Sequence, residues 1–223
     1  MKESRGCLRV NVGCGSTPTP GYLNFDNSPS VRLANHLIVC KLLLKVGLLE
    51  QTQYEFAAKA AASGNIRWAD AARHIPVPDA SVAVLYSSHM IEHMGRAEVV
   101  GFLREARRIL APNGVLRIAV PDLMGLARRY VNDGDADRFV GGTFLAVDEA
   151  PRLAGRIKAL VLGSRNHRWM YDAASLKRVL AEQAFVEPQS LPAGMTTIPD
   201  PGELNLRERE EESVYVEARV TTT

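Results

Sequence analysis

The sequence Val10-Asn11-Val12-Gly13-Cys14-Gly15 places two glycines, one residue apart, directly after a short apolar run. A second apolar run, Tyr22 to Phe25, follows and ends in Asp26. Glycines let a backbone approach a ligand closely, and a carboxylate at the tip of the next strand can accept hydrogen bonds from both hydroxyls of a ribose. The pattern predicts a nucleotide-type cofactor site at the edge of a doubly wound sheet, with an ordinary tight turn as the plainer alternative.

The glycine loop lacks the features that phosphate-bearing cofactors require. The third glycine of the dinucleotide motif would stand at position 18, which is Pro18, and no Gly-Lys-Ser/Thr follows. Pro18, Pro20 and Gly21 also prevent a helix from starting directly after the glycines, so no helix N-terminus points at a pyrophosphate. The loop therefore suits a cofactor with a ribose and an adenine but no phosphates, and S-adenosylmethionine, with S-adenosylhomocysteine as its product, is the obvious candidate.

Length and composition bound the class of protein. The 223 residues, 46% hydrophobic and 23% charged, are typical of one globular domain with a sizeable core. A net charge of +2 gives no reason to expect a nucleic-acid partner. Three cysteines without metal-type spacing disfavour a disulfide framework and predict a cytoplasmic protein. The apolar stretch 36–49 is too short to span a bilayer and contains two lysines, so we expect no transmembrane segment, with peripheral membrane contact left open.

Strands alternate with helices along the chain, which predicts a three-layer, mostly parallel α/β sheet with an antiparallel edge formed by the last strands. The expected strands are 8–12, 22–25, 66–70, 81–87, 115–120, 185–191 and 213–220, and the expected helices are 31–63, 96–110, 122–130 and 172–183. We expect a single domain over residues 1–223, with cover or lid segments at 31–63 and at the irregular 132–170. The charge run 207–212 is interpreted as a solvated connection.

Polar groups follow the expected strands where a ligand would bind in such a sheet, outside the carboxyl ends. Asp70 could accept from an adenine amino group while Ala71 offers its backbone N–H, although a turn cap and a helix N-cap are the plainer roles of Asp26 and Asp70. The full set of expected cofactor-binding residues is Asn11, Gly13, Cys14, Gly15, Asp26, Asn27, Asp70, Ala71, Ser87 and Ser88.

Five segments match a known pattern in order and spacing: Asn11–Gly15, Asp70 with Ile75–Val82, Ser87–His93, Glu105–Leu116 and Leu176–Val186. Through them the chain resembles the class I S-adenosylmethionine-dependent methyltransferases, type 11-like, especially the branch around quinone biosynthesis. The resemblance implies a seven-stranded sheet and a cofactor held by Gly13, Gly15, Asp26, Asp70 and Ala71. The usual first helix is replaced by Pro18-Thr19-Pro20-Gly21, as in a subset associated with polysaccharide synthesis, which favours a sugar-like hydroxyl as the acceptor.

Three histidines are the candidate catalytic residues: His89, His93 and His167. In a helical turn, His89, Glu92 and His93 would share one face. One histidine could then act as a base oriented by Glu92, because imidazole titrates near neutral pH. Alternatively, the trio resembles the Glu-x-x-Glu-His metal site of some methyltransferases, or it only orients the loop. No metal-ligand set is assigned.

The sequence thus predicts a methyltransferase acting on a hydroxyl or amine of a small-molecule or saccharide acceptor. A second hypothesis is a non-catalytic, methyltransferase-fold subunit that binds a partner protein through the apolar stretch 36–49. A nicotinamide-dependent oxidoreductase is a distant third, which Pro18 disfavours.

Overall fold

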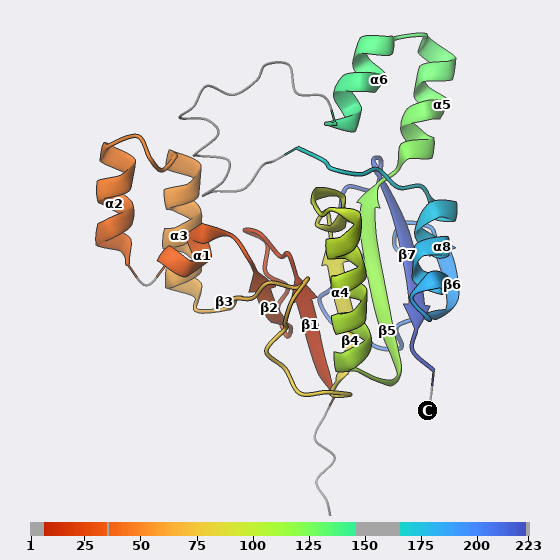
Figure 1. Cartoon of the computed structure of the whole chain (residues 1–223), viewed down its shortest axis with the longest axis horizontal. Helices are drawn as coiled ribbons and strands as arrows, with labels where there is room; N and C mark the ends of the chain where they lie inside the picture. The colour runs from red at the N-terminus through yellow and green to blue at the C-terminus, as the bar shows by residue number, and fades with distance from the viewer. Residues whose placement is uncertain (1–6, 35, 146–165, 222–223) are drawn as a thin grey trace, which may run out of the picture.

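The computed structural model describes residues 7–34, 36–145 and 166–221. Seven strands form one sheet in the order β3-β2-β1-β4-β5-β7-β6 (Figure 1). The strands are β1 (Leu8–Val12), β2 (Leu23–Asp26), β3 (Ile66–Trp68), β4 (Val82–Ser88), β5 (Leu110–Pro121), β6 (Val186–Leu191) and β7 (Ser213–Arg219). The first five are parallel, and β7 is antiparallel to both β5 and β6. The mostly parallel α/β sheet is confirmed, and the last two strands, β7 and β6, form the expected antiparallel edge.

The helices are α1 (Pro29–Leu33), α2 (Leu37–Lys45), α3 (Gln51–Ser63), α4 (Arg96–Ile109), α5 (Leu123–Asp133), α6 (Ala136–Thr143) and α8 (Ala173–Glu182), with a 3-10 turn η1 at Ile91–His93. Asp122 and Asp172 cap α5 and α8 by accepting backbone N–H groups, as their positions before apolar helices predict. None of the described helices is long and apolar enough to cross a membrane.

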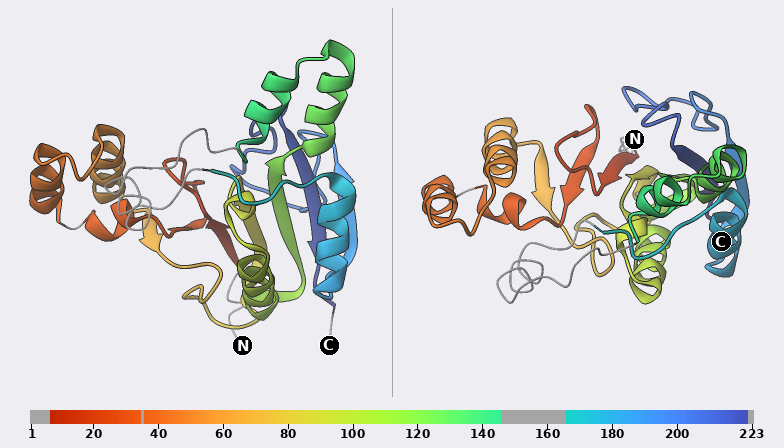
Figure 2. Two further views of the ribbon diagram at one scale, coloured as in Figure 1. Left: turned by 45° about the horizontal axis from the view of Figure 1, so that its top comes forward. Right: turned by 90° about the horizontal axis from the view of Figure 1, so that it is seen from above.

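One face of the sheet, here called the front face, is covered by α4 and α8 (Figure 2). Apolar side chains of alternate strand residues, among them Val10, Leu85 and Leu116, pack there against Phe102 and Leu103 of α4. The alternation follows the two-residue period of a strand, and the buried side of α4 follows the helical period that the sequence shows. This face therefore forms the main core.

The opposite face, here called the back face, carries a row of polar side chains across neighbouring strands. Asn24, Asn11, Tyr86, Arg117 and Glu217 are paired in register from β2 to β7, and all five are buried. We call these five residues the polar row. Apolar contacts from Ile198 and Leu204 cover the same face.

The cover of the back face is the loop 192–212, which joins β6 to β7. Arg117 donates from one guanidinium nitrogen to the carbonyl of Met195 (2.9 Å) and to the Glu217 carboxylate (2.7 Å), and from the other to the carbonyl of Leu206 (3.2 Å). Hydroxyls of Thr196 and Thr197 donate to the same carboxylate. The buried ion pair thus fastens the loop to the sheet.

No helix joins β1 to β2, as the prolines predict. The Asn11 side chain instead donates to the Thr19 hydroxyl, and the Asn24 side chain accepts from the Thr19 backbone N–H (2.8 Å). These bonds stiffen the Ser16–Gly21 connection. The loop 192–212 covers this part of the back face, where the Tyr22 hydroxyl donates to the carbonyl of Pro201 (2.9 Å).

The structure differs from the sequence-based prediction in both segments expected to be covers, 31–63 and 132–170. Residues 31–63 are not one helix, since α1, α2 and α3 are separate and α3 begins with a capping box at Glu50. At the edge of the back face, α1 and α3 pack on Ile66 of β3. The stretch 132–170 was expected to be irregular, but it contains α6, which packs on α5 despite Gly141 and Gly142. The remainder of that stretch, 146–165, lies outside the described residues.

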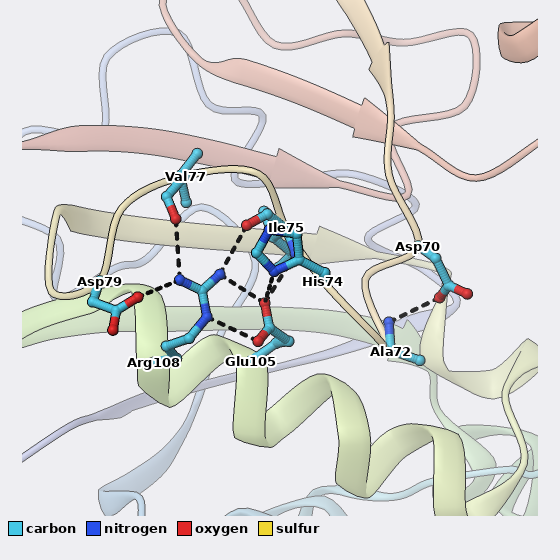
Figure 3. A network of polar contacts seen from close by, with 8 residues as sticks. All are labelled: Asp70, Ala72, His74, Ile75, Val77, Asp79, Glu105 and Arg108. Atoms are coloured by element: carbon cyan, nitrogen blue, oxygen red, sulfur yellow. Dashed lines mark hydrogen bonds and ion pairs between the residues drawn. The ribbon is translucent and has the colours of Figure 1, made fainter.

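The connection from β3 to β4 contains no helix and is held to α4 by one arginine (Figure 3). Arg108 donates to the carbonyls of Ile75 and Val77 and to the carboxylates of Asp79 and Glu105. A Cβ on Gly101 would lie 2.4 Å from the carbonyl oxygen of Ala72, so α4 approaches this loop at a position that only glycine fits. The contacts fix the segment after β3, which carries Asp70.

Candidate functional site

The glycine loop follows β1 at the carboxyl edge of the sheet. Gly13 and Gly15 both adopt left-handed backbone conformations, with φ of +69° and +51°, which explains why the loop needs glycine there. A Cβ on Gly13 would also lie 2.7 Å from the side chain of Met90. Met90, which the sequence did not single out, therefore packs directly against the loop and connects it to the segment after β4.

Asp26 lies at the tip of β2 and is already engaged with the chain. Its Oδ2 accepts the backbone N–H of Gly15 (3.0 Å), and its Oδ1 accepts that of Ser28 (2.8 Å). Each carboxylate oxygen has a further lone pair, so the group can still accept ribose hydroxyls. Both the cap role and the cofactor role predicted for Asp26 fit this geometry.

Two further residues expected to bind the cofactor, Asn11 in β1 and Cys14 in the loop, direct their side chains away from the carboxyl edge. Asn11 belongs to the polar row, and its amide bonds to Thr19 and Asn24. The Cys14 side chain packs with Val31 and Ala34. Burial, with a smaller contribution from Asp26, raises the pKa of this thiol to about 12. Only the backbone atoms of these two residues remain available to a ligand.

Asp70 follows β3 by two residues, because β3 ends at Trp68 and not at position 70 as predicted. Its Oδ1 accepts the N–H of Ala72 (3.1 Å), and Figure 3 shows this carboxylate standing apart from the Arg108 network. It caps a turn, not the helix that the sequence offered as the alternative. Ala71 is buried beside it. Asn27 uses its carbonyl to accept the indole N–H of Trp68.

Buried hydroxyls without a partner lie near the same edge. The side-chain oxygens of Ser87, near the end of β4, and of Ser28, after β2, have no hydrogen-bond partner among the described residues. Ser88 is the last residue of β4 and is partly buried. The Ser88 hydroxyl also lacks a described partner, and since buried polar groups are nearly always hydrogen-bonded, these hydroxyls are available to a ligand at this edge.

The three candidate histidines meet around Glu92, although His167 is far away in the sequence. Glu92 is 0% exposed, and neither carboxylate oxygen has a hydrogen-bond partner among the described residues. Its Oε1 lies 3.4 Å from His89 Nδ1 and 3.9 Å from His93 Nε2. The His93 and His167 rings meet edge to face, with centroids 5.0 Å apart. These four residues are called the histidine cluster below.

His167 reaches the cluster because its segment is bound to η1. The backbone N–H groups of Arg168 and Trp169 both donate to the carbonyl of Glu92, at 2.7 and 3.1 Å. His167 Nδ1 lies 2.8 Å from the carbonyl of Thr143, which assigns the proton to Nδ1 and leaves the Nε2 lone pair available. Burial lowers the pKa of His167, opposed in part by the charge of Glu92. The imidazole is therefore neutral near pH 7.

His89 is held differently. Its backbone is left-handed, with φ of +47°, so residues 89–93 do not form the single helical turn that the sequence predicts. Its Nδ1 lies 3.3 Å from the guanidinium of Arg209, and its Nε2 lies 2.9 Å from the Ser213 hydroxyl. His93 Nδ1 lies 3.2 Å from the carbonyl of Asn166. His89 is thus tied on both ring nitrogens, whereas His167 has one free.

A cavity of about 470 Å³ opens beside the histidine cluster. Its lining combines the three histidines with charged residues of both signs and with aromatic rings: Arg129, Asp133, Asp135, Arg138, Arg209 and Glu212, and Tyr130, Phe139 and Phe144. Most of these side chains come from α5 and α6. The expected lid region therefore contributes a wall of the cavity.

The charge run 207–212 was predicted to be only a solvated connection, but it contributes contacts to the site that the sequence did not identify. Glu208 accepts the Tyr86 hydroxyl (2.8 Å), Arg209 contacts His89, and Glu212 lines the cavity. These contacts cannot be predicted from the charge run itself, because it has no helical or strand periodicity and its partners are more than 100 residues away in the sequence. The loop that covers the back face therefore also reaches the cavity.

Glu92, His93 and His167 could also hold a metal ion. Each can bring one ligand atom within 4.8 Å of the others. Two imidazoles and a carboxylate are a donor set that suits zinc and other divalent transition metals. The arrangement differs from the trio in the sequence-based hypothesis, because His167 takes the place of His89.

The chain resembles known methyltransferases in part of its sequence and in its fold. Residues 10–118 match the family model of a methyltransferase domain. No curated protein sequence matches the chain.

Solved structures share the fold at low sequence identity. An S-adenosylmethionine-dependent methyltransferase from Methanosarcina mazei is 14% identical, with a TM-score of 0.52, over 99% of this chain and 95% of that one. A possible histamine N-methyltransferase from Thermotoga maritima is 17% identical, with a TM-score of 0.50, over 96% of this chain and 82% of that one. The sheet and these structures show the Rossmann-like class I methyltransferase fold, and both structures are described as S-adenosylmethionine-dependent methyltransferases.

The residues at the carboxyl edge fit that cofactor. The left-handed glycines leave the backbone open to close approach, Asp26 has lone pairs to spare, and Ser28 and Ser87 bury hydroxyls that lack partners within the described parts of the chain. These groups suit the ribose and amino-acid portions of a ligand that carries no phosphate.

Proposed function

We propose that the chain is an S-adenosylmethionine-dependent methyltransferase that methylates a hydroxyl, or an amine, of a small polar acceptor. The observation that carries the proposal is the histidine cluster, with its fully buried Glu92, opening on a cavity at the carboxyl edge of a class I methyltransferase sheet. The chain acts as a single domain, and α5 and α6 provide part of the acceptor site.

The cofactor would be held by the backbone at Gly13 and Gly15, by Asp26 at the ribose, and by Asp70 and Ala71 at the adenine. When bound, it supplies the methyl group and departs as a neutral thioether. Because that leaving group is good, most of the rate enhancement comes from aligning the acceptor with the methyl carbon.

The histidine cluster would take the acceptor proton. His167 presents an unprotonated Nε2 at neutral pH, since its Nδ1 donates to Thr143 and burial lowers its pKa. As the acceptor oxygen forms its new bond to carbon, its proton passes to this nitrogen. The buried carboxylate of Glu92 stabilises the resulting imidazolium, and His93 lies between the two and orients them.

The lining of the cavity favours a sugar-like acceptor. Arginines and carboxylates offer hydrogen bonds to several hydroxyls, while Tyr130, Phe139 and Phe144 provide apolar ring faces. A mainly apolar acceptor would displace water from these charged side chains, at a cost in free energy.

The first test is calorimetry of the full chain with S-adenosylmethionine and S-adenosylhomocysteine. We expect binding of both, weakened about 100-fold by Asp26→Ala, which removes two charge-assisted hydrogen bonds of the ribose. The matched control is Glu203→Ala, which removes an exposed carboxylate for which no side-chain contact is described. Folded wild-type protein that binds neither ligand would overturn the proposal.

The second test addresses the base. With a panel of monosaccharides and small phenols as acceptors, His167→Gln is expected to lower methyl transfer by about 100-fold and to leave S-adenosylmethionine affinity unchanged. His36→Gln, at an exposed histidine outside the cluster, should change neither. If chelation abolishes activity and zinc content falls in Glu92→Gln, the cluster is a metal site instead.

A non-catalytic, partner-binding role is the second candidate. It is favoured by the exposed apolar side chains of α2, for which methyl transfer has no use. A monomeric preparation that transfers methyl groups without any other protein would exclude this role.

A further inference from the structure

Helix α2 is apolar on two opposite sides. One side, formed by Leu37, Cys40 and Leu43, packs on Leu33 and on Tyr54 and Ala57 of α3. On the other side, Ile38, Leu42 and Val46 recur every fourth residue and form one stripe. A helix of a globular protein normally buries its only apolar stripe and places polar residues opposite. The second stripe of α2 is therefore not explained by the packing of the fold.

The second stripe is open to solvent. Ile38 is 79% exposed, Leu42 58% and Val46 67%, and Val39 and Leu48 beside them are also exposed. We call these five residues the outer stripe. Single exposed apolar residues are common on proteins, but a group of them along one helix and the turn after it marks an interaction surface.

The position of α2 leaves the outer stripe accessible. In Figures 1 and 2, α2 is the outermost element on the side of the molecule opposite α8 and β6. It packs on α1 and α3 and not on the sheet. A flat surface can therefore approach it without meeting the core of the protein.

The charges of α2 and of the residues before it have one sign, and the nearest carboxylate in the sequence is Glu50, after the outer stripe. Between Pro29 and Leu49 the sequence contains Arg32, Lys41 and Lys45 and no aspartate or glutamate. Lys41 and Lys45 are exposed and lie four residues apart, so they project together along one flank of α2. An apolar stripe bordered by lysines complements a surface that is apolar inside and negatively charged outside.

The composition of the outer stripe favours lipid over protein. All five residues are aliphatic, whereas the energetic centres of protein interfaces are enriched in tryptophan, tyrosine and arginine and depleted in lysine. Lysine side chains at a membrane extend their charged ends to the headgroups while their stems lie on apolar surface.

We propose that α2 docks the protein on an anionic lipid membrane, with the outer stripe in the interfacial layer and Lys41 and Lys45 at the headgroups. This inference is independent of the proposed methyl transfer, because no residue of the outer stripe belongs to the glycine loop or to the histidine cluster.

The test is co-sedimentation of the full chain with vesicles of phosphatidylcholine alone and of phosphatidylcholine mixed equally with phosphatidylglycerol. We expect binding to the mixed vesicles, weaker binding to phosphatidylcholine, and loss of the difference in high salt. Ile38→Glu/Leu42→Glu is expected to weaken binding to the mixed vesicles at least about tenfold, and Lys41→Glu/Lys45→Glu should do the same. The matched control is Val131→Glu, at a helical residue that is 81% exposed, and it should bind like the wild type.

Circular dichroism and S-adenosylmethionine affinity separate docking from folding, since the variants should match the wild type in both. Three results would overturn the proposal: no binding of wild type to anionic vesicles, equal binding by wild type and Ile38→Glu/Leu42→Glu, or a dimer in light scattering that Leu42→Glu dissociates. The last result would assign the outer stripe to a second copy of the chain.

Discussion

On the front face of the sheet, α4 and α8 bury apolar side chains that alternate along the strands. On the back face, much of the same area is covered by the loop 192–212, which contains no helix or strand and is held by the polar row. Both faces are buried, but the first depends on matched apolar shapes and the second on hydrogen bonds and one ion pair. The comparison teaches that a loop can replace helices when the strands beneath it carry polar anchors.

The difference has an energetic consequence. Apolar packing is tolerant because neighbouring side chains can relax, whereas a buried polar network is sensitive to the loss of a single partner. Substitutions on the back face should therefore depend strongly on whether one or both members of a pair are removed.

The largest effect is expected from Arg117→Leu. It leaves the Glu217 carboxylate buried without its cation, so the free energy of unfolding should fall by about 3–5 kcal/mol. The double variant Arg117→Leu/Glu217→Leu should recover a large part of that loss. Urea denaturation measures both, and a single variant that costs less than about 1 kcal/mol would contradict the anchoring role.

Leu103→Ala removes a fully packed side chain of α4 from the front face. We expect a loss of about 3 kcal/mol from the lost transfer free energy and the cavity that remains. Measured beside Arg117→Leu in urea, this loss should not change with added salt. If salt alters it appreciably, the contrast between the two faces is wrong.

Glu217→Gln tests the polar anchor through pH. Burial alone would raise the pKa of Glu217, but hydrogen bonds from Thr196, Thr197 and Arg117 outweigh it and hold the pKa below its ordinary value of 4.5. Stability from this ionised group is present above the ordinary value and is lost as the pH falls through the lower, native value. The substitution should therefore cost about 2 kcal/mol at neutral pH.

The difference between wild type and Glu217→Gln should shrink as the pH falls below 4.5, because the wild-type carboxylate then becomes protonated. Urea denaturation across that range measures it. A difference that is constant with pH would show that Glu217 is not held as an anion.

The smallest effect is expected from Tyr86→Phe. The variant keeps the buried ring and loses only the hydrogen bond to Glu208 (2.8 Å), so it should cost about 1 kcal/mol in unfolding free energy. Because Glu208 is next to Arg209 in the sequence, the same variant should also alter ligand binding in the cavity. Fluorescence-monitored unfolding gives the first quantity, and unchanged stability would argue against this anchor.

The burial of the central strands could be predicted from the sequence, but the loop that covers the back face could not. A continuous apolar run marks β4 as buried on both faces, and the period of α4 marks the side that it buries. By contrast, Arg117 and Glu217 read as residues of a solvent-facing side of a strand. They are buried by a loop that contacts them only in the folded chain, and no local sequence pattern in 192–212 predicts that contact.

The candidate site also combines residues that could be predicted from the sequence with residues that could not. Gly13, Gly15 and Asp26 were predicted because they lie within one strand-loop-strand unit. The side-chain directions of Asn11 and Cys14 are set by strand alternation and by α1 and α3, which the residue types alone do not show. The meeting of His167 with His93 depends on the backbone bonds from Arg168 and Trp169 to Glu92, so no spacing rule could have found it.

The anchors of the back face also bear on how the chain is made. The ribosome synthesises β1 to β5 well before residues 192–212. Until then, the loop that buries Asn11, Asn24 and Tyr86 does not yet exist. An apolar surface in that position would favour association between nascent chains, whereas a hydrated polar one does not. We therefore expect the polar row, which lies beside the apolar side chains of Val84 and Val115, to limit association of the unfinished domain during translation.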